Sequence, residues 1–217
     1  MGFGFRAVPI ATVKYSFSKQ HFRAAKFFAS QASAIEQEAI PVPEARQAEH
    51  RAYVTGAVLL SVAALESSIN ELYHEIISKE KKTIGHLDSR AIDLIVGMWA
   101  ETERAPILQK YQRALLFSGR QVFDKSASTF QRTDDLIRLR DALVHYKPEW
   151  DIEHKPQRGH GNIQKRLRGQ FPLNPDAKGV WFPHQCLGAG CAEWATKIAF
   201  AFMKEFCDRF GVIQRLP

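Results

Sequence analysis

Apolar residues recur at three- and four-residue spacing along most of the chain, which predicts a succession of helices. Over Ser16–Ala39 this spacing indicates one amphipathic helix, and the prolines in Ile40–Pro43 end it because proline cannot continue a helix interior. A second helix is predicted over Pro43–Lys79. Its middle, Ala57–Leu65, is apolar on nearly every side. Since such a helix lies in the middle of a bundle, we expect it to be the central one.

The same spacing predicts further helices downstream. Their expected bounds are Ser89–Glu103, Pro106–Phe117, Ser128–Tyr146 and Ala192–Phe210. Ser128 and Gln131 have the spacing of a capping box, and Gly211 suits the end of the last helix. No strand pattern competes, so the predicted fold class is all-α, a bundle of about five to six helices.

Residues 149–190 lack helical periodicity and are rich in glycine and proline, so we expect a long loop before the last helix. Between His154 and Lys178 only Asp176 opposes six basic residues, which leaves a net charge of 6 − 1 = +5. The six are Lys155, Arg158, Lys165, Arg166, Arg168 and Lys178. The predicted organisation is a single domain over 1–217, with an N-terminal extension at 1–15 and a basic loop insertion at 149–190.

Composition narrows the class of protein. Of 217 residues, 45% are hydrophobic and 24% charged, which excludes disordered, collagen-like and disulfide-scaffold proteins. The formal charge of +7 permits a polyanionic partner without proving one. No secretory signal is recognisable at Met1–Arg6, and the apolar run Val54–Leu65 is too short for a membrane span. We therefore expect a cytoplasmic protein without membrane contact.

Three cysteines are too few, and odd in number, for a disulfide framework. His184, Cys186 and Cys191 form the one arrangement that resembles a metal site, but closed zinc sites need a fourth ligand. We interpret these cysteines as free thiols near a helix start and expect no metal and no cofactor.

Candidate chemistry is concentrated in Asp134–Pro148. On a helix, Arg140 lies inside the apolar arc defined by leucines such as Leu136 and Leu143, so its guanidinium must find an anion. Asp141 and His145 are four residues apart and share a different face. In a regular helix Arg140 and His145 diverge by about 140°. Either Pro148 loosens the last turn and lets them converge, or the polar face meets a second subunit.

Two interpretations of this segment remain open from the residues alone. Arg140 could be a bundle arginine paired with a carboxylate, for which Glu66 is a natural partner, and His145 could simply favour the helix C-terminus. Alternatively, both belong to an active site.

The sequence Arg140-Asp-Ala-Leu-Val-His145 resembles the R-[N/D/H]-x3-H signature of the HEPN superfamily. The segment Ala64–Tyr73 also resembles an early central helix of these proteins, and the likeness extends over about Ser16–Phe210. The resemblance implies an all-α, usually dimeric bundle. The long loop departs from the family's compact pattern.

Many HEPN proteins are metal-independent ribonucleases in which two motifs face each other across a dimer cleft. The resemblance therefore implies that Arg140 and His145 are catalytic and that Asp141 supports them. The RNA's own 2′-hydroxyl would attack the adjacent phosphodiester. His145 can transfer a proton near neutral pH, and Arg140 can hold the phosphate. Implied partners are RNA and a second copy, with a toxin or phage-defence role and an antitoxin or other protein partner as further possibilities.

Glu66 and Asn70 share one face of the central helix and either form a buried polar network or support the active site. The expected RNA contacts are Tyr146, Lys155, Arg158, Lys165, Arg166 and Arg168. The basic loop is either a flap on RNA or a solvated, mobile insertion, and Tyr146 either stacks on a base or packs internally. Two alternatives to catalysis stand: a non-catalytic HEPN module that binds RNA, nucleotide or protein, and a helical interaction protein with a structural Arg140–Glu66 pair.

Overall fold

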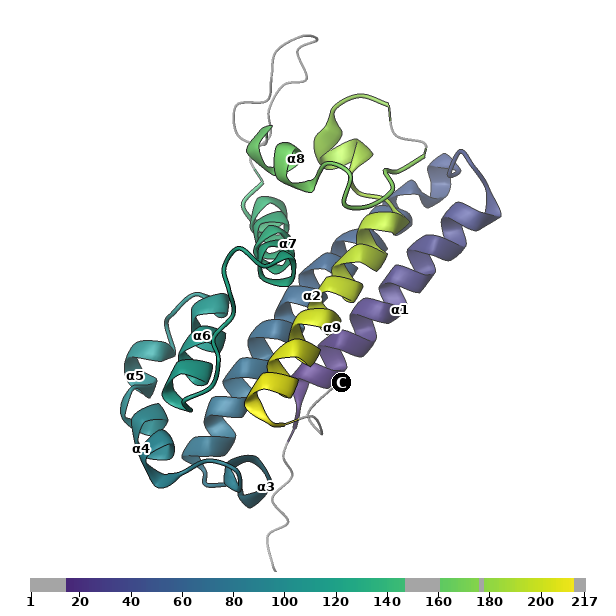
Figure 1. The fold of residues 1–217 in the computed structure, drawn as a ribbon. Coiled ribbons are helices and arrows are strands. Elements are labelled where there is room, and N and C mark those ends of the chain that lie inside the picture. Colours follow the sequence, from purple (N-terminus) through teal and green to yellow (C-terminus); the bar gives the residue numbers. More distant parts are fainter. Residues whose placement is uncertain (1–14, 147–160, 176–177, 213–217) are drawn as a thin grey trace, which may run out of the picture.

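The computed structural model describes residues 15–146, 161–175 and 178–212. Its helical segments, in chain order, are α1 (Phe17–Glu38), α2 (Glu44–Ile77), α3 (Lys81–Ile84), α4 (Ser89–Gly97), α5 (Trp99–Thr102), α6 (Ile107–Phe117), α7 (Ser128–Val144), α8 (Gly161–Leu167), the short π-helix η1 (Trp181–Gln185) and α9 (Ala189–Phe210). No strand occurs in these described ranges, so the predicted all-α class is confirmed (Figure 1).

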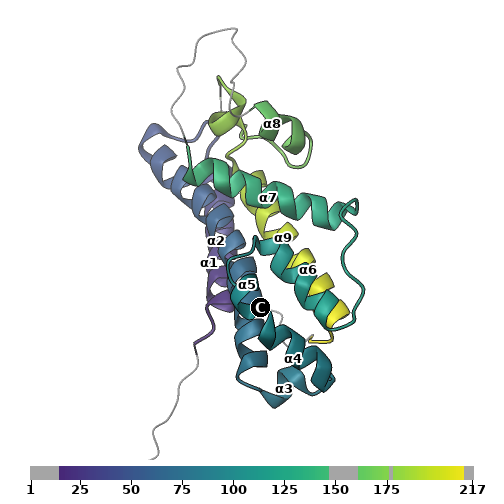
Figure 2. The same ribbon diagram turned by 90° about the vertical axis from the view of Figure 1, so that its left-hand side faces the viewer.

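Three long helices form the body of the molecule. Figures 1 and 2 show α1, α2 and α9 side by side along their lengths, while α7 crosses α2 and α9 at a steep angle. Helices α3 to α6 gather at one end of α2, and α8 and η1 lie at the other end. α2 packs against α1, α4, α6, α7 and α9, which confirms it as the central helix.

Small residues let the long helices approach closely. On α1, Ala25, Ala29 and Ala32 are buried one helical turn apart and face α2 and α9. On α2, Gly56 lies directly beneath the Phe28 ring, where an added Cβ would stand 2.5 Å from Phe28 Cδ2. A larger residue at position 56 would therefore require the Phe28 ring to move or α1 and α2 to separate.

α2 is long and apolar enough to cross a membrane by length and composition alone, because the run Val54–Leu65 continues into a helix of 34 residues. In its most apolar window 44% of the residues are buried inside the protein. A central bundle helix passes the same test, so this single helix is weak support for a membrane span.

Carboxylates from neighbouring helices cap the N-termini of two long helices. Glu71 on α2 accepts hydrogen bonds from the Ser18 backbone N–H at 2.9 Å and from the Ser18 hydroxyl at 2.7 Å. Glu36 near the end of α1 accepts one from the Ala189 N–H at 2.7 Å and lies 2.8 Å from His50 Nε2. Negative charge at a helix start also complements the helix dipole. These contacts fix both ends of the three-helix body.

Several predicted boundaries are corrected. The helix expected over Ser89–Glu103 is divided into α4 and α5, which flank Met98. The N-cap of α7 is Ala127, and no side chain caps it, so the capping box predicted at Ser128 and Gln131 does not form. The structure also contains more helical segments than the five to six expected.

The segment 149–190, predicted to be loop, contains α8 and η1 within its described part. Its apolar residues Ile163, Leu167, Phe171 and Phe182 are buried and belong to the main core. Apolar burial of this extent is the physical reason that this part is ordered on the bundle rather than being the solvated insertion that one interpretation allowed.

Candidate functional site

Arg140 lies on the last full turn of α7, on the side that faces α2. Leu136, one turn before it, and Leu139, the residue before it, are fully buried. Of the Arg140 side chain, 28% is exposed. Arg140 lines a small surface notch of about 190 Å³ together with Glu66 and Val144. The remaining wall of the notch is apolar and comes from α2: Leu59, Val62 and Ala63. The position predicted for Arg140, inside the apolar arc, is therefore confirmed.

The charge of Arg140 is only partly compensated. Its Nε lies 3.2 Å from Asp141 Oδ1, but the atom is buried and forms no hydrogen bond among the described residues. Glu66 lines the same notch without forming an ion pair with Arg140 in the described part of the chain. Its carboxylate lies instead 4.0 Å from Lys110 Nζ. The predicted Arg140–Glu66 pair is therefore absent here, and the guanidinium is left able to bind a further anion.

His145 is the residue directly after α7 and is exposed to solvent. Its N–H donates a hydrogen bond of 2.9 Å to the Asp141 carbonyl, so the α-helical pattern continues to its backbone nitrogen. Because the last turn is regular, Arg140 and His145 project about 140° apart around the axis. A loosened last turn that brings the two side chains together is not seen up to His145, and Pro148 lies outside the described residues.

Asp141 shares a face with His145 and is half-exposed, and no hydrogen bond joins their side chains among the described residues. Its one side-chain contact of note is the approach to Arg140. Asp141 is thus placed to influence the arginine more directly than the histidine.

Glu66 and Asn70 are partly exposed, and both approach the buried Lys110. Lys110 on α6 is only 3% exposed, and its Nζ donates a hydrogen bond of 2.9 Å to Asn70 Oδ1. The Lys110 carbonyl also accepts a 3.1 Å hydrogen bond from the buried Tyr73 hydroxyl. The network joins α2 to α6, which favours the structural interpretation of Asn70, whereas Glu66 connects this network to the notch at Arg140.

The predicted RNA contacts have different surroundings. Lys155 and Arg158 lie outside the described residues. Lys165 and Arg168 are exposed and form no ion pair within the described ranges. Tyr146 is 43% exposed, and its ring lies 6.0 Å from the Phe182 ring, so part of its surface packs internally.

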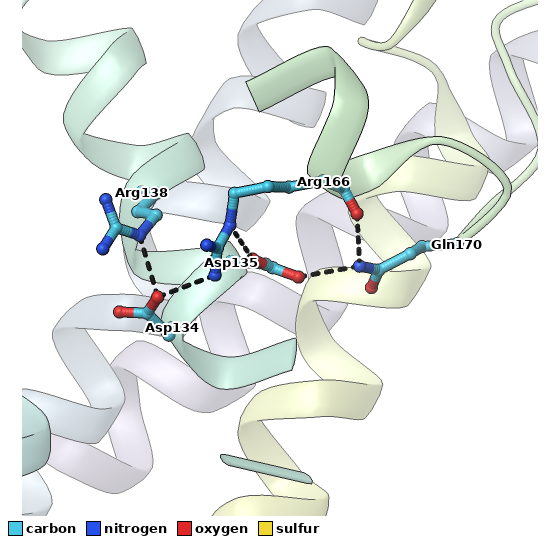
Figure 3. Close-up of polar contacts among 5 residues, drawn as sticks. All are labelled: Asp134, Asp135, Arg138, Arg166 and Gln170. Carbon is cyan, nitrogen blue, oxygen red and sulfur yellow. Dashed lines mark hydrogen bonds and ion pairs between the residues drawn. The ribbon is translucent and has the colours of Figure 1, made fainter. Parts of the chain in front are cut away.

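Arg166 differs from these residues because carboxylates on α7 hold it (Figure 3). Its Nε donates to Asp135 Oδ1 at 2.5 Å, and its NH2 group donates to Asp134 Oδ2 at 2.8 Å. Gln170 Nε2 donates to the other Asp135 oxygen at 2.8 Å, and Arg138 Nε donates to Asp134 at 2.8 Å. This cluster fastens α8 to α7, so the charge of Arg166 is already matched within the chain.

All three cysteines have free thiols and are buried. Burial raises the pKa of Cys186 to about 12 and raises that of Cys191 as well, so both thiols are neutral at physiological pH. No group of three His, Cys, Asp or Glu side chains suited to a metal ion occurs in the part of the chain that the structure describes.

Lys110 and Asp135 are two buried charged residues that the sequence reasoning missed. Lys110 is three residues after the buried Ile107 and four before the buried Ala114, and Asp135 is four before the buried Leu139. Both therefore lie inside an apolar arc, as Arg140 does. The criterion that identifies Arg140, a charged residue inside an apolar arc, also identifies Asp135 on the same helix and Lys110 on α6.

Comparison with models of protein families, with curated proteins and with solved structures finds no match to this chain.

Proposed function

We propose that this protein is a metal-independent endoribonuclease of HEPN type that acts in the cytoplasm as a homodimer. The observation that carries the proposal is the incompletely paired Arg140 guanidinium in a surface notch, five residues before an exposed histidine at the end of the same helix. An arginine guanidinium can hold a phosphate, and a histidine side chain can act as a general acid or base.

In the proposed reaction, the 2′-oxygen of the RNA forms a bond to the adjacent phosphorus while the bond from phosphorus to the 5′-oxygen breaks. One histidine accepts the 2′-hydroxyl proton and another donates a proton to the leaving 5′-oxygen. Arg140 stabilises the negative charge that develops on the phosphoryl oxygens. The products are a 2′,3′-cyclic phosphate and a 5′-hydroxyl, and no water or metal ion is consumed.

Two copies of the chain suit this chemistry better than one. Since Arg140 and His145 project about 140° apart, a phosphate held by the Arg140 of one copy would be served most easily by the His145 of another. Val144 lies between them in sequence and is 55% exposed, although it is apolar and lines the notch. A second copy that covers this apolar residue would bring the two motifs together.

The test is RNA cleavage in the presence of EDTA. The wild-type protein is expected to yield 2′,3′-cyclic phosphate ends, and His145→Ala is expected to abolish them. The matched control is His74→Ala, which removes an exposed histidine near the end of α2 and should leave cleavage intact. Equal activity in the His145 variant and the wild type would refute the proposal.

The second candidate is a non-catalytic HEPN module that binds RNA, nucleotide or a protein partner. It is favoured by the divergence of Arg140 and His145, because a single chain then supplies only half of a phosphodiesterase site. Under this alternative the protein binds RNA with no cleavage products at any protein concentration, and His145→Ala changes affinity alone.

A toxin or phage-defence role is a further part of the proposal. Induced expression in bacteria is then expected to arrest growth, and His145→Ala is expected to relieve the arrest. Co-expression of a neutralising antitoxin or other protein partner would restore growth while the protein itself remains wild type. Normal growth on full expression of an active ribonuclease would contradict this role.

A further inference from the structure

A groove of about 830 Å³ lies between α6, the first half of α7 and the segment that contains α8. Polar and charged side chains line most of it, among them Gln109, Lys125, Gln131, Arg132, Asp135 and Arg168. We call it the α6–α8 groove. It does not include Arg140 or His145, so it is separate from the notch described above.

A stripe of polar side chains on α7 joins this groove to His145. At 100° per residue its members lie within about 80° of one another around the helix, and over about 21 Å along it. In order from the groove they are Gln131, Asp134, Arg138, Asp141 and His145. Gln131 and Asp134 line the groove itself. An extended ligand bound at His145 can therefore follow one face of α7 directly into the groove.

The carboxylates in the groove are already neutralised. Asp135 is 6% exposed and is held by Arg166 and Gln170, and Asp134 accepts hydrogen bonds from Arg138 and Arg166 (Figure 3). The residues that line the groove include four basic side chains and two acidic ones. Both acidic side chains form ion pairs with one of the basic residues, Arg166. The charge that remains available is positive.

Three basic side chains carry that available charge. Lys125, Arg132 and Arg168 are exposed, line the groove and form no ion pair with any residue that the structure describes. They come from three parts of the chain: the α6–α7 connection, α7 and the residue after α8. Their convergence on one cavity is therefore a product of the fold.

Groups that suit nucleobases accompany the cations. The exposed Gln109 and Gln131 carry amides that can donate and accept hydrogen bonds at base edges. Phe130 is half-buried in the same wall and offers part of an aromatic ring. Sites for single-stranded nucleic acid usually combine cations that bind the phosphates with aromatic rings and amides that contact the bases.

We infer that the α6–α8 groove is a second RNA-binding subsite, which holds the strand at a distance from the phosphodiester that is cleaved. This inference rests on the proposed ribonuclease function for the direction of the strand, which runs from His145 along α7 into the groove. The binding itself can be measured without cleavage.

The test uses the full chain with His145→Ala, so that RNA remains intact, and a labelled single strand of about twelve nucleotides. Binding is followed by fluorescence anisotropy as salt is raised. Adding K125Q, R132Q and R168Q together is expected to weaken binding about tenfold and to reduce the slope of log K against log salt by about 2. Circular dichroism checks that the variant is folded.

The matched control removes three positive charges from a different part of the protein surface. Lys19, Arg23 and Lys26 lie about one helical turn apart on α1, which Figure 1 shows on the opposite side of α2 and α9 from α6 and α7. The triple change K19Q, R23Q and K26Q should weaken binding far less. Equal losses in the two triple variants would overturn the subsite, because net charge alone would then explain binding.

Two further outcomes separate this inference from the proposed function. Loss of RNA binding in the groove variant, with no cleavage by the wild type, would support the subsite and refute the ribonuclease. Cleavage by the wild type with unchanged RNA binding in the groove variant would refute the subsite alone. A polyglutamate peptide that binds the groove more tightly than RNA would also overturn the inference by assigning the groove to acidic protein segments.

Discussion

Arg140 and Arg166 both lie against α7, yet their surroundings differ. Arg166 donates hydrogen bonds to two carboxylates on α7, and one of these, Asp135, is buried. Arg140 approaches a single half-exposed carboxylate and has a buried Nε without an acceptor among the described residues. The comparison teaches that a basic residue in this chain is informative about ligands only after its partners within the fold are known.

The largest expected effect contrasts Arg140 with Arg138, two residues before it on α7. We expect Arg140→Ala to lower kcat for RNA cleavage by about 10²–10³, since one donor to the developing phosphoryl charge is removed. Arg138→Ala should change kcat by less than about twofold and act mainly on KM, because Arg138 pairs with Asp134 on the proposed path of the strand, away from the phosphodiester that is cleaved. Steady-state kinetics on both purified variants provide the measurement.

For this contrast, thermal unfolding serves as the control. A lower kcat in Arg140→Ala with an unchanged Tm indicates a functional arginine. A collapse of Tm without a matching loss of activity per folded molecule would instead make Arg140 a structural residue, like Arg166.

A smaller effect is expected around Lys110. Its side chain is buried, whereas the side chain of Arg166 is partly exposed. We expect Asn70→Ala to lower the free energy of unfolding by about 3 kcal/mol, because the ammonium loses its hydrogen-bond acceptor inside the protein. Lys110→Met should cost little, and combining it with Asn70→Ala should recover most of the loss. Urea unfolding followed by circular dichroism measures all four forms. Additive losses in the double variant would contradict this account.

The smallest effect separates the two aspartates that hold Arg166. Asp135→Ala should lower the free energy of unfolding by about 1–2 kcal/mol, because it removes the acceptor of Arg166 Nε and one of the two acceptors of Gln170 Nε2. Asp134→Ala should cost less than about 1 kcal/mol, since its side chain is 32% exposed and water can replace it. Equal costs at the two positions would show that burial does not govern this cluster.

Local periodicity was enough to predict the long helices. α1 and α2 lie within one or two residues of the expected bounds, and the prolines between them separate the two helices as the sequence indicates. α2 was also predicted to be central, because a helix apolar on all sides has to be covered by other helices. These features depend only on residues close together in the chain.

The parts that could not be predicted depend on contacts distant in sequence. α8 is a short helix whose Arg166 is paired with carboxylates more than 30 residues earlier, so nothing local marks its position. By charge, Glu66 is a natural partner for Arg140, but Lys110 from a third helix approaches it instead. At the candidate site, the sequence predicted which face Arg140 occupies, whereas the choice of its partners needed the assembled bundle.

The Glu36 carboxylate has a consequence for how the protein is made. It bonds the first residue of α9, which is 153 positions later in the chain, and α9 also covers α1 and α2 along their lengths. Until α9 has been synthesised, the apolar surfaces of α1 and α2 that it buries have no cover. The bundle therefore closes only after α9 has been made, and a growing chain needs protection from aggregation until α9 emerges from the ribosome.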